Sequence, residues 1–167
     1  GSASYSTPIA KQGERVGVSY ARSYYTLGGA FSALDYTGTA QTLSVYWQHN
    51  FKRSRDVNIY GIVRLDLKSL EDEAKGMAYS NPKSAHNWVF GINGDSLDRF
   101  WTGGKNTFAL NYTHGDLSID DEMQRLYDAA TAQTAGQFGK WNLELTRLQH
   151  VSDRVSLYLS YQRQWAS

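Results

Sequence analysis

The sequence predicts an all-β protein, an antiparallel transmembrane β-barrel segment of about eight strands that occupies residues 1–167 as a single domain. Three observations support this prediction. Apolar and polar residues alternate in short runs along nearly the whole chain, as in strands with two unlike faces. The connections between these runs alternate between short and long. Aromatic residues make up 14% of the chain and include 12 tyrosines, a residue type that collects at membrane–water interfaces.

The alternating runs define the predicted strands. In one of them, Trp88, Phe90 and Ile92 alternate with polar residues such as Asn87 and Asn93. Each run has about the length, ~9–11 residues, with which a tilted strand crosses a bilayer. The run at the N-terminal end has the weakest alternation. The predicted strands are 2–9, 15–24, 40–50, 56–67, 86–95, 106–114, 140–148 and 154–165.

The predicted connections sort by length. Those at 10–14, 51–55 and 149–153 are short, and the one at 95–105 is intermediate. Those at 25–39, 68–85 and 115–139 are long. Short turns at one end and long loops at the other are typical of outer-membrane barrels, whose short turns face the periplasm.

The longest connection is predicted to contain a short helix. Ser118 followed by Asp121 resembles a helix start, because side chains of these types accept hydrogen bonds from the first free N–H groups. Apolar residues then recur at helical spacing and share one face. These residues are Met123, Leu126, Tyr127 and Ala130.

The alternation assigns side chains to two faces. Aromatic residues are expected to form lipid-facing girdles at two heights, with Arg22 and Arg163 near the rim. The girdle at the long-loop end contains Tyr20, Tyr24, Trp88, Tyr112, Trp141, Tyr161 and Trp165. The girdle at the short-turn end contains Trp47, Phe51, Trp101 and Phe108.

Polar residues of the opposite phase are expected to face the lumen. They either line a hydrated channel or pair with one another inside a filled interior. The predicted lumen-facing residues are Tyr46, Tyr60, Arg64, Asp66, Asn93, Asp95, Asn111, Asn142, Glu144, Tyr158 and Gln162.

Several classes of function are disfavoured. The chain has no cysteine for a disulfide scaffold or thiolate site, and its net charge of +1 gives no sign of nucleic-acid binding. The four histidines lack metal-ligand spacing, and no nucleotide-binding or nucleophile motif occurs. We therefore expect no enzyme activity, no metal and no cofactor. A bacterial outer membrane is the expected location, with the lipid bilayer and lipopolysaccharide as partners. The Gly-Ser start suggests a processed or engineered N-terminus.

Four segments resemble the outer-membrane transporters of two-partner secretion, the haemolysin-activator family that includes the transporters of contact-dependent growth-inhibition toxins. The similarity extends over nearly the whole chain, and the last segment is the most specific. The segments are YTLGGAFSAL at 25–34, TGTA at 37–40, RSRDVNIY at 53–60 and LYDAATAQTAGQF at 126–138.

The resemblance implies a larger transporter. Members of this family have a plug helix, two POTRA domains and a 16-stranded barrel, and export a large, partly unfolded adhesin, haemolysin or toxin without ATP. The chain is similar to the fourth through eleventh strands of such a barrel, and the partner would be a secreted TpsA-type polypeptide. The POTRA domains, the plug and the Val-Arg-Gly-Tyr/Phe loop lie outside the similar region. No functional motif of the family therefore falls on a residue of this sequence.

Two alternatives remain open at this level. The first is an engineered or excised small closed barrel of eight strands, with a structural role and a lumen filled by side chains such as Tyr46, Tyr60 and Tyr158. The second is a soluble, lipocalin-like binding barrel. Pairing between the first and last strands would indicate either of these closed forms.

Overall fold

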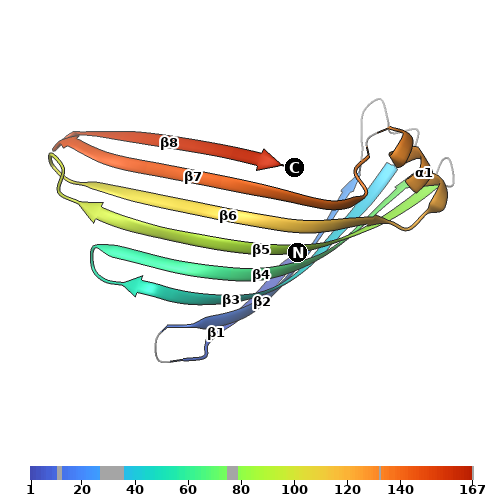
Figure 1. Ribbon diagram of the computed structural model, residues 1–167, viewed down its shortest axis with the longest axis horizontal. Coiled ribbons are helices and arrows are strands. Elements are labelled where there is room, and N and C mark those ends of the chain that lie inside the picture. Colours follow the sequence, from blue (N-terminus) through green and yellow to red (C-terminus); the bar gives the residue numbers. More distant parts are fainter. Residues whose placement is uncertain (11–12, 27–35, 75–78, 132, 167) are drawn as a thin grey trace.

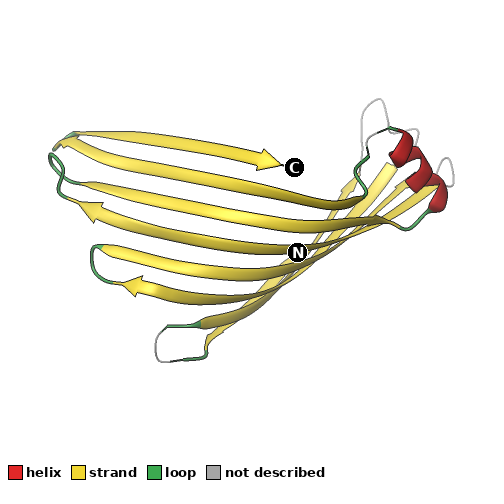
Figure 2. Cartoon of the chain, viewed as in Figure 1, coloured by secondary structure: helices red, strands yellow, loops and turns green. Residues whose placement is uncertain are grey.

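The computed structural model describes residues 1–10, 13–26, 36–74, 79–131 and 133–166. Eight strands form one sheet, and a single helix lies at one end of it (Figures 1 and 2). The all-β prediction is confirmed. The elements in chain order are β1 (Ser2–Pro8), β2 (Arg15–Thr26), β3 (Tyr36–Arg53), β4 (Val57–Ala74), β5 (Tyr79–Asp98), β6 (Gly104–Ile119), α1 (Glu122–Ala130), β7 (Gly136–Ser152) and β8 (Val155–Ala166).

The sheet is a curved antiparallel meander in which each strand pairs with the next strand of the chain. β1 and β8 lie at opposite edges and do not pair in the described part of the chain (Figure 1). The closed eight-stranded alternatives are therefore wrong for these residues. A closed barrel of this size needs an interior filled by packed side chains. Here one face instead carries hollows of about 330 to 550 Å³.

The strands are staggered as they are in a barrel wall. One row of directly paired residues begins one residue inside β2, at Val16, and ends one residue before the end of β8, at Trp165. From β2 to β8, the row therefore shifts from the short-turn end of the strands to their opposite end. Such a stagger is the shear that tilts the strands of a barrel. The complete row is Val16, Trp47, Val63, Phe90, Tyr112, Trp141 and Trp165.

Most strands are longer than the alternation predicts. β4 and β5 have 18 and 20 residues, and within the predicted long loop 68–85 they pair over 68–74 and 79–85. That prediction is wrong because apolar alternation ends at Leu67, whereas the backbone hydrogen bonds of a ladder do not depend on apolar side chains. The connection between these strands is only 75–78, which lies outside the described residues. The predicted 25–39 loop, with much of the YTLGGAFSAL segment, falls largely on 27–35, also outside them.

The remaining connections follow the predicted arrangement. The short turns 54–56, 99–103 and 153–154 lie at one end of the sheet, and 120–135 lies at the other end with α1 (Figure 2). The structure shows that the intermediate connection predicted at 95–105 is a tight turn. Trp101 takes a positive φ of 56° there, and Gly103 one of 95°.

The predicted helix is present, but its start differs from the prediction. Asp121 is the N-cap, and its side chain accepts a hydrogen bond from the backbone N–H of Gln124 at 2.8 Å. Ser118 belongs to β6 and does not cap the helix. Met123, Leu126 and Tyr127 are all exposed. With only nine residues in α1, the described helical structure is too short and too polar to span a membrane.

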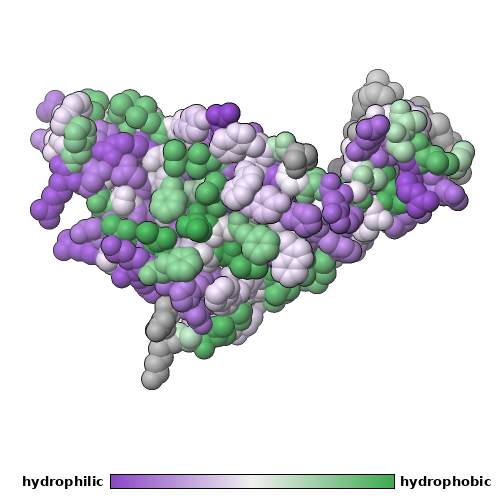
Figure 3. Space-filling view, in the orientation of Figure 1, coloured by the Kyte–Doolittle hydropathy of each residue, from purple (hydrophilic) through white to green (hydrophobic). Residues whose placement is uncertain are grey.

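Exposure alternates most clearly in the inner strand β5, where the large apolar side chains take the exposed positions, whereas the edge strand β8 is exposed throughout. In β5, Trp88 and Phe90 are 46% and 47% exposed, whereas their neighbours Asn87 and Val89 are 7% and 8% exposed. Soluble proteins bury their large apolar side chains and expose polar ones. Hydrophobic and near-neutral residues gather over the middle of the face seen in Figure 3, and hydrophilic residues gather toward its left-hand end. The sheet thus has the reverse of the usual polarity.

The extension of β4 and β5 can be tested by cross-linking, because the chain has no cysteine of its own. Ser69 and Ser84 are directly paired. Paired Cα atoms of an antiparallel ladder lie about 4.5–5.5 Å apart, within disulfide range. Ser69→Cys combined with Ser84→Cys should form a disulfide rapidly under mild oxidation, as measured by gel mobility.

Ser69→Cys combined with Ala85→Cys is the matched control. Ala85 is one residue out of register, so its side chain points to the other face of the sheet and should not cross-link. Equal cross-linking of the two pairs would indicate a loop at this position.

Candidate functional site

The predicted lumen-facing residues all lie on one face of the sheet, which we call the polar face. The register establishes this, because directly paired residues share a face. Tyr46 pairs with Arg64, and Asn111 pairs with Asn142. A hollow of about 550 Å³ opens on this face and extends from β3 to β7. Predicted residues that line it include Tyr46, Tyr60, Arg64, Asp66, Asn93, Asn111 and Asn142.

A buried carboxylate lies at the centre of the polar face. Asp66 is 6% exposed, and its Oδ1 lies 2.9 Å from Nε of Arg64, the residue two positions earlier in β4. Asn87 pairs directly with Asp66 from β5. The amide Oδ1 of Asn87 is buried and accepts no hydrogen bond from the described residues. Such an acceptor is satisfied by water or by a donor group of a ligand.

The structure adds two cations to the hollow that the sequence analysis missed. Lys68 and Lys140 both line it. Lys68 was missed because it fell in a predicted loop. Lys140 has the same strand phase as Asn142, which was a usable signal. Together with Arg64, they place three cations around the carboxylate of Asp66 in the lining of this hollow.

Other predicted lumen residues lie apart from this hollow. Glu144 and Gln162 line a neighbouring hollow of about 450 Å³ that extends from β6 to β8. Asp95 lies nearer the short turns, where its Oδ2 accepts a hydrogen bond from Nδ2 of Asn58 at 3.3 Å. Tyr158 is 63% exposed on the edge strand β8. The polar face is therefore a broad lining with several hollows.

The register places most of the predicted girdle aromatics on the opposite face, which we call the apolar face, whereas Trp101 lies in the turn between β5 and β6. Several are in ring contact, such as Tyr112 and Trp141 with centroids 4.8 Å apart. Arg163 also lies on this face and places its guanidinium over the ring of Trp165, 4.8 Å from the centroid. The girdle residues on this face are Tyr20, Tyr24, Trp47, Trp88, Phe108, Tyr112, Trp141, Tyr161 and Trp165.

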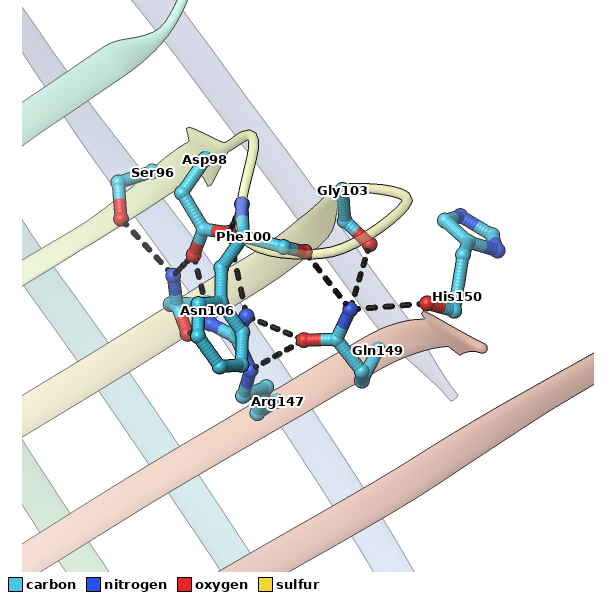
Figure 4. Close-up of polar contacts among 8 residues, drawn as sticks. All are labelled: Ser96, Asp98, Phe100, Gly103, Asn106, Arg147, Gln149 and His150. Atoms are coloured by element: carbon cyan, nitrogen blue, oxygen red, sulfur yellow. Dashed lines mark hydrogen bonds and ion pairs between the residues drawn. The ribbon is translucent and has the colours of Figure 1, made fainter. Parts of the chain in front are cut away.

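A cluster of polar side chains lies at the short-turn end of the apolar face (Figure 4). The guanidinium of Arg147 donates to both carboxylate oxygens of Asp98, at 2.6 and 3.1 Å. Nδ2 of Asn106 also donates to Asp98, at 2.8 Å. Arg147 above all, and then Asn106, hold the pKa of Asp98 well below its usual range. The two partners lie 49 residues apart in sequence, so their pairing was not predicted.

Gln149 completes this cluster and holds the turn between β5 and β6 (Figure 4). Gln149 is 5% exposed, and its side-chain amide nitrogen Nε2 donates hydrogen bonds to three backbone carbonyl oxygens. Those carbonyls belong to Phe100 at 3.0 Å, Gly103 at 3.1 Å and His150 at 2.8 Å. The side chain of Gln149 thus adds hydrogen bonds at the turn, where Phe100 also accepts from the backbone N–H of Gly103, and Gly103 from that of His150.

At the other end of the sheet, Asp128 organises the segment that follows α1. Its carboxylate accepts hydrogen bonds from the backbone N–H groups of Thr134 and Ala135, at 2.8 and 2.9 Å, and from the Thr134 hydroxyl at 2.5 Å. The Thr134 hydroxyl and the Ala135 N–H hold the pKa of Asp128 below its usual value. Asp128 was not singled out in sequence, because an Asp within a helix is usually a solvated surface residue.

The described residues contain no group of three or more His, Asp or Glu side chains that could hold a metal ion. No known protein family, curated protein or solved structure matches the chain. The two faces differ in the interactions that they offer. The polar face offers hydrogen bonds and charged groups, and the apolar face offers exposed apolar surface.

Asp128→Asn should loosen the 120–135 connection. Because the pKa of Asp128 is lowered by folding, its stabilisation is complete above the unfolded value of about 3.9 and is lost as the pH falls through the folded value. At pH 7, the variant should therefore be cut by trypsin after Arg125 faster than the wild type. Below the folded pKa of Asp128, amide hydrogen exchange at Thr134 and Ala135 should become equal in both proteins.

Asp120→Asn is the control, since Asp120 is an exposed carboxylate in the same connection. It should leave both the cleavage rate and its pH dependence unchanged. A similar acceleration in the two variants would show that net charge, rather than the hydrogen bonds of Asp128, governs the connection.

Proposed function

We propose that this chain forms part of the wall of a bacterial outer-membrane β-barrel pore. The observation that carries the proposal is the reversed polarity of the sheet. Trp88, Phe90 and Ile92 are all nearly half exposed, whereas Asp66 and Asn87 are shielded. Water does not stabilise a continuous exposed apolar surface of this kind, but lipid does. The polar face then lines the aqueous interior.

The backbone fits the same environment. Every strand from β2 to β7 is hydrogen-bonded to a neighbouring strand on both sides. A bilayer tolerates strands only when their backbone groups are paired in this way. The free edges of β1 and β8 would need partner strands in lipid, so the proposal places further strands of a larger barrel beside them.

More specifically, we propose that the pore belongs to a two-partner secretion transporter. The resemblance of 53–60 and 126–138 to that family supports this assignment. The substrate would be a secreted TpsA-type polypeptide that passes as an unfolded chain. Amide, hydroxyl and guanidinium groups on the polar face would exchange hydrogen bonds with its backbone as readily as with water.

The bilayer assignment predicts a sharp difference between the two faces. Phe90→Arg puts a cation on the apolar face and should destabilise the lipid-inserted chain by about 2–4 kcal/mol. Asn93→Arg, three residues away in β5, puts the same cation on the polar face and should cost far less. Urea unfolding in phosphatidylcholine vesicles, followed by tryptophan fluorescence, measures both.

Two results would count against a membrane wall. One is stable folding of the wild-type chain in plain buffer as a monomer. The other is equal destabilisation by Phe90→Arg and Asn93→Arg, since a sheet with water on both faces should not distinguish them.

The transport assignment needs a separate test. The eight strands can replace the fourth through eleventh strands of a two-partner secretion transporter, and export of its partner can be assayed by immunoblot of the medium. Export should persist with the wild-type segment and be lost when the segment carries Phe90→Arg. A segment that inserts fully but exports nothing would contradict the transport assignment while leaving the barrel assignment intact.

A further inference from the structure

A groove of about 400 Å³ lies on the apolar face over β3 to β7. Its lining residues are glycine, aliphatic or aromatic except for His49. Gly61 forms part of its floor, where an added Cβ would lie 2.8 Å from the ring of Phe51. The side walls include Trp47, Phe51, Val63, Phe90, Ile92 and Trp141.

Positively charged side chains lie near one end of the groove, at the end of β3 and in the turn to β4. Phe51 lines the groove and is followed by Lys52, which pairs with Ile59 on the apolar face, and by Arg55 in the turn to β4. Arg53 between them pairs with Asn58 and lines a hollow on the polar face. All three cations are exposed, and none forms an ion pair within the described residues. The only acid in this turn is Asp56.

The turn between β7 and β8 is balanced in charge, and in the turn between β5 and β6 the one acid, Asp98, is paired with Arg147. Arg99 follows Asp98 in the turn between β5 and β6, and Arg154 follows Asp153 in the turn between β7 and β8. Residues 51–56, with three cations and one acid, carry the largest net positive charge of the short turns. An apolar groove with cations at its mouth matches an amphiphile that has a hydrocarbon chain and an anionic head group.

We propose that this groove binds one acyl chain of an anionic phospholipid, with the lipid phosphate held by Lys52 and Arg55. The inference rests on the proposed function, because it requires the apolar face to lie in a bilayer. Phe51 to Trp47 spans about 13 Å of strand at 3.3 Å per residue, which is enough to follow a chain well into the hydrocarbon layer. The bound lipid would fill the space above Gly61 that the side chains leave open.

Brominated lipids test the site, because bromine quenches tryptophan fluorescence on contact. Two single-tryptophan variants are made by changing the other four tryptophans to Phe. One keeps Trp47 in the groove. The other keeps Trp165, which is equally exposed on the apolar face but lies outside the groove, and carries Arg163→Gln to remove the cation over the Trp165 ring. Each is refolded in phosphatidylcholine vesicles containing phosphatidylglycerol, with bromine on the acyl chains of one lipid at a time.

Trp47 should be quenched more strongly by brominated phosphatidylglycerol than by brominated phosphatidylcholine, whereas Trp165 should be quenched equally by both. Removing each cation should reduce the preference for phosphatidylglycerol at Trp47 by about fivefold. Lys52→Gln with Arg55→Gln should therefore abolish it. The matched control is Arg99→Gln with Arg154→Gln, which removes two cations from short turns away from the groove and should preserve it.

Gly61→Leu should fill the groove and reduce quenching of Trp47 by both lipids, while Trp165 is unchanged. Equal quenching of Trp47 by the two lipids, or equal loss of preference in the two double variants, would overturn the lipid site. Absence of quenching at both tryptophans would instead show that the chain is outside the bilayer and would overturn the proposed function as well.

A second measurement does not depend on the tryptophan substitutions. Phosphatidylglycerol that co-purifies with the otherwise unaltered chain can be counted by native mass spectrometry. Lys52→Gln with Arg55→Gln should lose the bound lipid, and Arg99→Gln with Arg154→Gln should retain it. Retention in both variants would contradict the proposal.

Discussion

The antiparallel hydrogen-bonded ladder is the interaction on which the rest of the structure depends. Since successive side chains of a strand point to opposite faces, a continuous ladder from β1 to β8 carries each residue's face across the whole sheet. Trp47 and Trp165, five strands apart, share the apolar face for this reason. A slip of one residue in any strand would move its aromatic residues to the polar face and its charges to the apolar one. The register therefore maintains the separation of the two surfaces.

Both surfaces are shaped by places where a side chain is missing. Gly61 opens the groove on the apolar face, and Gly91, which pairs with Asn111, makes room on the polar face. A Cβ at Gly91 would lie 2.1 Å from Oδ1 of Asn111. The sheet is one layer thick, so hollows on its two sides share the same strands. The volume available to a ligand or lipid is decided by a few glycines rather than by the curvature of the sheet alone.

The ends of the sheet are held by charged groups that would be unfavourable in its middle. Arg147 and Asp98 pair at the short-turn end, and Asp128 accepts three hydrogen bonds at the other. Each carboxylate meets donors that stabilise its ionised form, which is why the pKa of each lies below its usual value. Such clusters are compatible with a membrane wall because they lie beyond the apolar band, where water is available.

The number of strands, the two faces and the helix could be predicted from the sequence, because period-two and helical spacing are local properties of neighbouring residues. Asn87 and Trp88 reveal their opposite faces without any knowledge of their partners. The extension of β4 and β5 over 68–74 and 79–85 could not be predicted, since a polar ladder leaves no apolar pattern. The Asp98–Arg147 pair, the hollow around Asp66 and the groove over Gly61 also required the tertiary structure. Each is assembled from different strands, and only the pairing register decides which of their residues meet.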